Sequence, residues 1–180
     1  MAGSQLYIGA PNGVVVCVDS IGELGGDFSG RLFHKYSRDS IPFASVGYMI
    51  RYMENLFNEL NFPKASTNLR VFPRPDGSAG GTGNEARKTR KAGEEKVQVM
   101  SDNDLLSQHG YQGTFIIRVQ HRQNSTWQGR ITWADKDMTQ TFRSVWEMIN
   151  LMESAMTEET PPEGAGALAS WDGNGSEEGK

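Results

Sequence analysis

The second half of this 180-residue sequence repeats the pattern of the first half, which restricts the folds that the chain can adopt. Shifting the sequence by 99 positions aligns residues 28–57 with residues 127–156 without a gap, and nine of the 30 pairs are identical. Chance gives about two identities over such a length at average composition. The identical pairs are Gly30/Gly129, Arg31/Arg130, Phe43/Phe142, Ser45/Ser144, Val46/Val145, Met49/Met148, Ile50/Ile149, Met53/Met152 and Glu54/Glu153. The alignment therefore predicts two copies of one structural unit.

Each copy has the hydrophobic pattern of three strands followed by a helix. In the second copy, apolar and polar residues alternate along 114–123 and along 127–133, which is typical of half-buried strands. A short third strand is expected at 138–142. The helix that follows is predicted to begin with a capping box, in which Ser144 accepts a backbone N–H and Glu147 reaches back to the start of the helix.

The first copy has the same helical stripe, which ends before Pro63. The apolar positions of this stripe are Val46, Met49, Ile50, Met53, Leu56 and Phe57. We therefore predict an α+β fold in which two tandem β-β-β-α repeats form an antiparallel sheet, with the helices packed on one face. The expected boundaries are 1–71 for the first repeat, 72–96 for a flexible linker, 97–157 for the second repeat and 158–180 for a disordered acidic tail.

Composition separates two polar segments from the repeats. The segment 72–96 is rich in glycine and carries a short basic run, which indicates a solvated linker. It does not fit the glycine-rich Walker pattern of phosphate-binding loops. The tail 158–180 carries six acidic residues and one basic residue, so it accounts for the net charge of −4. We expect the tail to keep the protein in solution, with competition for a basic groove on the same chain as the alternative.

The titratable residues exclude several classes of site. The single cysteine, Cys17, excludes an internal disulfide and a cysteine-rich zinc site. The three histidines, His34, His109 and His121, lack the spacing of metal ligands. No motif of a nucleophilic or nucleotide-dependent enzyme is present. We therefore expect no catalytic residues, no metal and no cofactor.

The hydropathy pattern also bears on the location of the protein. No apolar stretch approaches the roughly 18–20 residues of a membrane span. The first residues lack the basic and apolar regions of a secretory signal. Together with the single cysteine, these features predict a cytoplasmic protein without a membrane partner.

Arginines on the polar face of the predicted strands form one candidate binding surface. Arg118, Arg122 and Arg130 are expected to project together from the second copy, and Arg31 from the first. Arginines interleaved with amide side chains contact phosphates in nucleic-acid complexes. A solvated strand face explains the same pattern, so both interpretations stay open.

Trp146 is the second candidate, because it lies beside the apolar stripe of its helix and aligns with Gly47. The common core therefore does not require a tryptophan at this position. Tryptophan is frequent among the residues that dominate protein interfaces, which makes Trp146 a candidate anchor for a partner. Packing against the linker or the other copy is the alternative.

Two stretches resemble a known group of sequences. Residues 122–129 (RQNSTWQG) and 142–152 (FRSVWEMINLM) match R-Q-N-x-x-W-Q-G and F-R-S-x-x-E-x-I-x-L-M. The chain therefore resembles a family of small uncharacterised bacterial proteins, which implies no particular activity. The β-β-β-α order is also similar in topology to the N-terminal domains of HicB-like antitoxins, although their acidic-Leu-Pro-Gly-Cys turn is absent.

These observations favour a protein without catalytic activity. We expect a protein-interaction or regulatory module whose partner is a protein, in a pathway that the sequence does not specify. The alternative is a nucleic-acid-binding accessory protein that uses the basic strand face. The oligomeric state and the packing of the two copies stay open at this stage.

Overall fold

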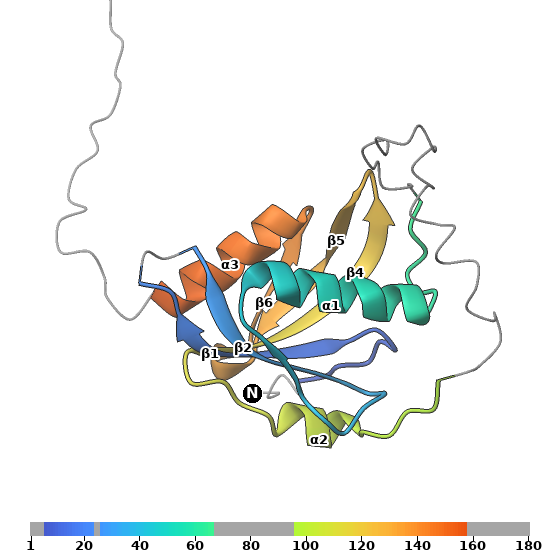
Figure 1. Cartoon of the computed structure of the whole chain (residues 1–180), viewed down its shortest axis with the longest axis horizontal. Coiled ribbons are helices and arrows are strands. Elements are labelled where there is room, and N and C mark those ends of the chain that lie inside the picture. The colour runs from blue at the N-terminus through green and yellow to red at the C-terminus, as the bar shows by residue number, and fades with distance from the viewer. Residues whose placement is uncertain (1–5, 24–25, 67–95, 158–180) are drawn as a thin grey trace, which may run out of the picture.

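The computed structural model describes residues 6–23, 26–66 and 96–157 of the chain. The fold is α+β, with a six-stranded antiparallel sheet and helices on both of its faces (Figure 1). In chain order the elements are β1 (Val14–Ile21), β2 (Phe28–His34), β3 (Ile41–Phe43), α1 (Val46–Glu59), α2 (Asp102–Leu106), β4 (Gly113–Gln123), β5 (Thr126–Trp133), a 3-10 turn (Ala134–Lys136), β6 (Met138–Phe142) and α3 (Val145–Thr157). None of the helices in these ranges has the length and apolar character needed to cross a membrane.

The sheet joins the two halves of the chain through its central strands. Its order is β3-β2-β1-β4-β5-β6, so each half contributes three neighbouring strands. The β1–β4 register is symmetric about the pair Val15–Ile116. Val18 lies opposite Gly30 and Val119 lies opposite Gly129, so Val15 and Ile116, three residues earlier on each strand, are equivalent positions of the two halves. Both central strands are therefore shielded on both edges along their paired residues, and β3 and β6 form the two edges of the sheet.

Each hairpin contains a bulge near its tip. The register shifts between Val18 and Ser20 in β1, and between Val119 and His121 in β4. A bulge places two residues opposite one, and the alternation of side chains between the two faces is displaced beyond it. Residues after each bulge therefore lie on the face opposite to that which strict alternation predicts.

The long helices α1 and α3 pack on the same face of the sheet, called the helix face below (Figure 1). Each contributes two fully buried methionines, Met49 and Met53 from α1 and Met148 and Met152 from α3. These methionines pack against the apolar side chains that β1, β2, β4 and β5 place on the helix face. The helical stripes predicted from both copies thus form one continuous core, because they share a single sheet.

The first turn of α3 has a modified capping arrangement. The Ser144 hydroxyl accepts from the Glu147 N–H at 3.1 Å, as predicted. The Glu147 carboxylate, however, accepts from the N–H of Arg143 at 2.6 Å instead of reaching Ser144. It also pairs with the Arg143 guanidinium at 3.1 Å. The helix therefore begins with a cap that extends one residue further back than a standard capping box.

The opposite face of the sheet, which contacts α2, carries a second apolar cluster. Its buried members are Ile8, Val15, Cys17, Phe33, Leu105 and Ile116. The short helix α2 covers this cluster from below the sheet (Figure 1). It is held in place by the ion pair of Lys35 with Asp102 at 2.6 Å. The repeat pattern does not predict α2, so the expectation that helices pack on one face holds for α1 and α3 and is wrong for α2.

The described element order is β-β-β-α in each half, with α2 between the halves. The expected linker at 72–96 lies outside the described residues, apart from Lys96. The expected acidic tail at 158–180 lies outside them entirely.

Two glycines allow adjacent strands to approach each other closely. A Cβ atom at Gly30 would lie 2.0 Å from the carbonyl oxygen of Cys17. A Cβ atom at Gly129 would lie 2.1 Å from the carbonyl oxygen of Arg118. Both neighbours are backbone atoms of the paired strand, so a side chain at either position forces the strands apart.

We therefore expect Gly129→Ala to lower the free energy of unfolding by about 2 kcal/mol, in the range of overpacked cores. Gly47→Ala is the matched control, because the nearest atom to its Cβ lies 3.7 Å away and the site is in a helix. Alanine should stabilise α1 there by about 0.5 kcal/mol. Urea unfolding measures both effects, and equal changes in the two variants would contradict the close approach at Gly129.

Candidate functional site

Arg122 does not lie on the polar strand face. The bulge between Val119 and His121 turns it to the helix face, where only 5 % of the residue is exposed. The prediction that Arg122 projects together with Arg118 and Arg130 is therefore wrong. The reason is the displaced alternation beyond the bulge, which hydrophobic periodicity does not reveal.

The buried guanidinium of Arg122 connects the β4–β5 hairpin to α1. It donates to Glu54 Oε1 at 2.9 Å, to Asn58 Oδ1 at 2.6 Å and to the Pro63 carbonyl oxygen at 2.7 Å. The indole N–H of Trp127 donates to the second oxygen of Glu54 at 2.9 Å. A buried cation is stable only when it is paired and its N–H groups are satisfied, and this network meets both conditions. Arg122 is thus part of the folded core.

Arg31 lies on the opposite face of the sheet, in an ion pair. Its guanidinium donates to both carboxylate oxygens of Asp19, at 2.8 and 3.0 Å, and to the His109 carbonyl oxygen at 3.1 Å. The hydrogen bond from Arg31 is the largest cause of the lowered pKa of Asp19. The positive charge of Arg31 is therefore matched by a neighbouring carboxylate, which weakens its attraction for phosphate.

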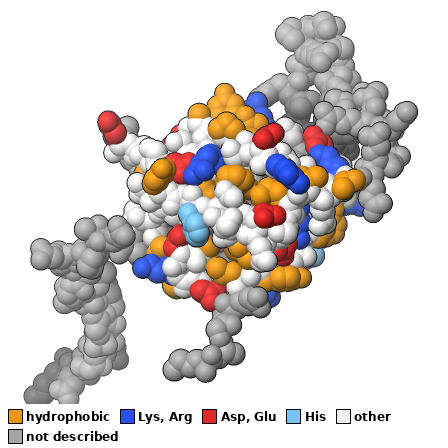
Figure 2. Space-filling view, turned by 90° about the horizontal axis from the view of Figure 1, so that it is seen from below, with side chains coloured by type: hydrophobic (Ala, Val, Ile, Leu, Met, Phe, Trp, Pro, Cys, Tyr) orange, Lys and Arg blue, Asp and Glu red, His pale blue; other side chains and the backbone are white. Residues whose placement is uncertain are grey.

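Arg118 and Arg130 are the two predicted arginines that the structure brings together. They lie directly opposite each other on β4 and β5, on the face away from α1 and α3. Arg130 is exposed, whereas Arg118 is half-buried and its Nε atom has no hydrogen-bond partner within the described ranges. Figure 2 shows the molecule from the side of α2, where basic and acidic side chains are interspersed. The expected surface of four arginines is thus reduced to one pair.

Trp146 lies in the first turn of α3 and is 70 % exposed. It therefore does not pack into the described part of the other half. The linker, the other alternative to a partner anchor, lies outside the described residues apart from Lys96. The neighbouring residues of the apolar stripe, Met148 and Ile149, are buried and fix the helix beneath it. The indole is thus presented to solvent from a rigid element.

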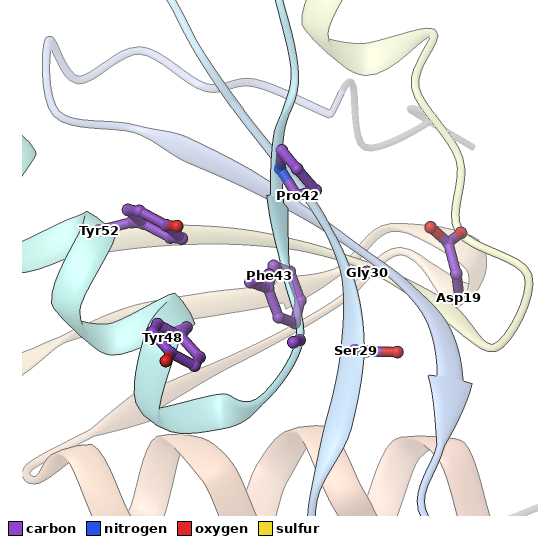
Figure 3. A pocket seen from close by; sticks show the side chains of 8 residues that line it. Asp19, Ser29, Gly30, Pro42, Phe43, Tyr48 and Tyr52 are labelled. Atoms are coloured by element: carbon purple, nitrogen blue, oxygen red, sulfur yellow. The ribbon is translucent and has the colours of Figure 1, made fainter.

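A shallow depression lies beside the edge strand β3 (Figure 3). Phe43, Tyr48 and Tyr52 line one side of it, and the two tyrosine rings stack at 6.5 Å. Asp19 on the other side is the one charged residue of the lining, and it is paired with Arg31. Sequence analysis did not predict this depression, because its residues come from four separate elements. It gathers aromatic surface, and its one carboxylate, Asp19, lies on the side opposite Tyr48 and Tyr52.

Two buried titratable groups belong to the core. Burial raises the pKa of the Cys17 thiol to about 11, so the thiol is protonated at neutral pH. Burial is also the largest cause of the lowered pKa of His34, with Lys96 as the next cause. Within the residues described, no three His, Cys, Asp or Glu side chains gather closely enough to hold a metal ion. Neither Cys17 nor His34 thus forms part of a titratable cluster of that kind.

Comparisons with protein-family models, with curated proteins and with solved structures found no match for this chain. The resemblance to the family of small bacterial proteins and the topological similarity to HicB-like antitoxins therefore stay predictions. The assignment of a function rests on the geometry of the surfaces described above.

We expect Arg122→Met to lower the free energy of unfolding by about 3 kcal/mol, because it leaves the Glu54 carboxylate without its buried partner. Arg130→Met is the control, since Arg130 is exposed, and its effect should stay within about 0.5 kcal/mol. Urea unfolding followed by tryptophan fluorescence measures both variants. Similar unfolding curves for the two variants would show that the Arg122 network is not structurally important.

His34 should make stability depend on pH, because its folded-state pKa lies below the ordinary value of 6.5. Between the folded and unfolded pKa values the unfolded chain binds more protons, so the free energy of unfolding falls as pH decreases through 6.5. We expect the protein to be less stable at about pH 5.5 than at about pH 7.5, and His34→Gln to reduce this difference.

Proposed function

We propose that this protein is a protein-interaction or regulatory module without catalytic activity, and that Trp146 anchors its partner. The observation that carries the proposal is the 70 % exposure of Trp146 in the first turn of a well-packed helix. The aligned position in α1 is Gly47, which is also exposed, so packing among the described residues does not account for the tryptophan.

The position of Trp146 is suited to binding. A large aromatic side chain in solvent gains free energy when a partner removes it from water. The helix that carries it is fixed by the buried methionines Met148 and Met152 and by the cap at Ser144. A rigid helix loses little conformational freedom when it binds, and this favours affinity.

Affinity purification of the tagged full chain from its native host tests this function. The wild type should retain a stoichiometric protein after nuclease treatment and at moderate salt, and Trp146→Ala should weaken that interaction at least about tenfold. Tyr111→Ala is the matched control, because it removes another exposed aromatic ring from a bend before β4, away from the helix that carries Trp146. Equal retention by Trp146→Ala and the wild type would contradict the proposed anchor.

A nucleic-acid-binding accessory function is the second candidate. The cross-strand pair Arg118–Arg130 supports it, because the two residues lie directly opposite each other on β4 and β5 and the Nε of Arg118 has no hydrogen-bond partner in the described part of the chain. In the same purification, nucleic acid that is lost at high salt and in the Arg118→Ala/Arg130→Ala double variant would favour this function over the first.

We infer further that the two halves are copies of one β-β-β-α unit. The same order of elements, the symmetric register at Val15–Ile116 and the equivalent close contacts of Gly30 and Gly129 support this origin. The proposed setting is the bacterial cytoplasm. The buried free thiol of Cys17 is consistent with a reducing compartment.

A further inference from the structure

The edge strand β6 has features of a pairing surface. It is five residues long, contains neither proline nor a charged residue, and its first four residues are exposed. No other strand of the described residues lies along its outer edge. An edge strand presents unpaired backbone N–H and C=O groups, which form a template for another strand.

The other edge of the sheet is protected. Strand β3 has three residues, and the central one is Pro42. Proline lacks a backbone N–H, and a very short strand with proline is a common way to prevent pairing at an edge. Within the described residues, β6 is therefore the edge that is better suited to pairing with another strand.

The residues that flank β6 have opposite charges. Asp137 precedes the strand and Arg143 follows it, and both are exposed. In an antiparallel pair of two β6 strands centred on Gln140, the Asp137 end of each strand lies beside the Arg143 end of the other. The segment is therefore complementary in charge to itself, as a two-fold symmetric interface requires.

We propose that β6 pairs antiparallel with β6 of a second copy of this chain, with the two-fold axis at Gln140. The pairing extends the six-stranded sheet of each copy into one continuous sheet across the dimer. This inference rests on the sheet edge and is independent of the partner proposed for Trp146.

The register centred on Gln140 also matches the side chains on each face of the sheet. On the helix face, Met138, which is 51 % exposed, lies opposite Phe142 of the second copy, whose ring is already buried in its own core, so the pairing covers mainly Met138. On the opposite face, Thr139 lies opposite Thr141 of the second copy. Apolar pairs and threonine pairs directly across antiparallel strands are favourable. A shift of the register by two residues removes the pairing of Asp137 with Arg143 and part of the ladder of backbone hydrogen bonds between the two β6 strands.

Arg143 is able to serve two carboxylates. Its side chain is 87 % exposed and pairs with Glu147 of the same chain. A guanidinium has five N–H donors, so the contact with Glu147 leaves donors for Asp137 of the second copy. Exposed ion pairs contribute little energy individually, and their role here is to select the register.

The oligomeric state of the full chain tests the proposal. The wild type should show concentration-dependent association from the monomer mass of 19.9 kDa to twice that mass in sedimentation equilibrium. Gln140→Lys places two like charges on the axis and should raise the dissociation constant at least about tenfold. Asn150→Lys is the matched control, because it adds the same charge at an exposed position of α3 and should leave association unchanged.

A charge exchange tests the register. Arg143→Glu alone and Asp137→Lys alone each place like charges opposite each other and should weaken the dimer about tenfold, whereas the double variant should restore it. Asp137 has a positive φ of 52°, which favours few residue types, so Asp137→Lys can also destabilise the fold. Urea unfolding of each variant separates loss of pairing from loss of folding.

Three results would overturn the proposal. A wild type that stays monomeric at about 0.5 mM excludes a dimer of useful affinity. A dimer that is insensitive to Gln140→Lys forms through another surface. A dimer that Gln140→Lys dissociates, but for which the charge exchange gives no rescue in correctly folded variants, has another register. Fast hydrogen exchange at the outward-facing β6 amides in the dimer would identify the second case, because pairing in any register protects them.

Discussion

The pairing of β1 with β4 is the contact on which the rest of the fold depends. Each half alone has three strands and one long helix, which bury too little apolar surface for a stable domain. The central pair removes one exposed edge from each half and lets α1 and α3 cover a common core. The Arg122–Glu54 ion pair then connects the helix of the first half to the hairpin of the second. The two halves therefore depend on each other for their tertiary structure.

Much of the secondary structure could be predicted because it follows from local patterns. Alternating residues gave the strands of the second half, and the apolar stripes gave both long helices. The run Val14–Val18 is apolar on both faces, as expected for a central strand, and the structure buries all of it. Helix α2 could not be found in this way. It has five residues, and its position depends on the distant ion pair of Lys35 with Asp102.

The candidate surfaces were harder to predict than the fold, because they depend on register. The bulge after Val119 displaces Arg122 into the core, and no hydrophobic pattern marks a bulge. Arg31 is neutralised by Asp19, which lies on a different strand. The exposure of Trp146 agrees with its position beside the helical stripe, whereas its role as an anchor stays a prediction. Sequence periodicity thus identifies what is buried more reliably than which polar groups meet.

Pro42 in β3 limits how far the sheet of this protein can extend by pairing with strands of other copies. A sheet with two open edges can add copies without limit and grow into a fibre, as cross-β assemblies do. In the part of the chain that the structure describes, Pro42 interrupts one edge, and no strand lies along the outer side of β6. Strand pairing through β6 therefore ends at two copies, with the three-residue β3 and its Pro42 at each outer edge of the joined sheet.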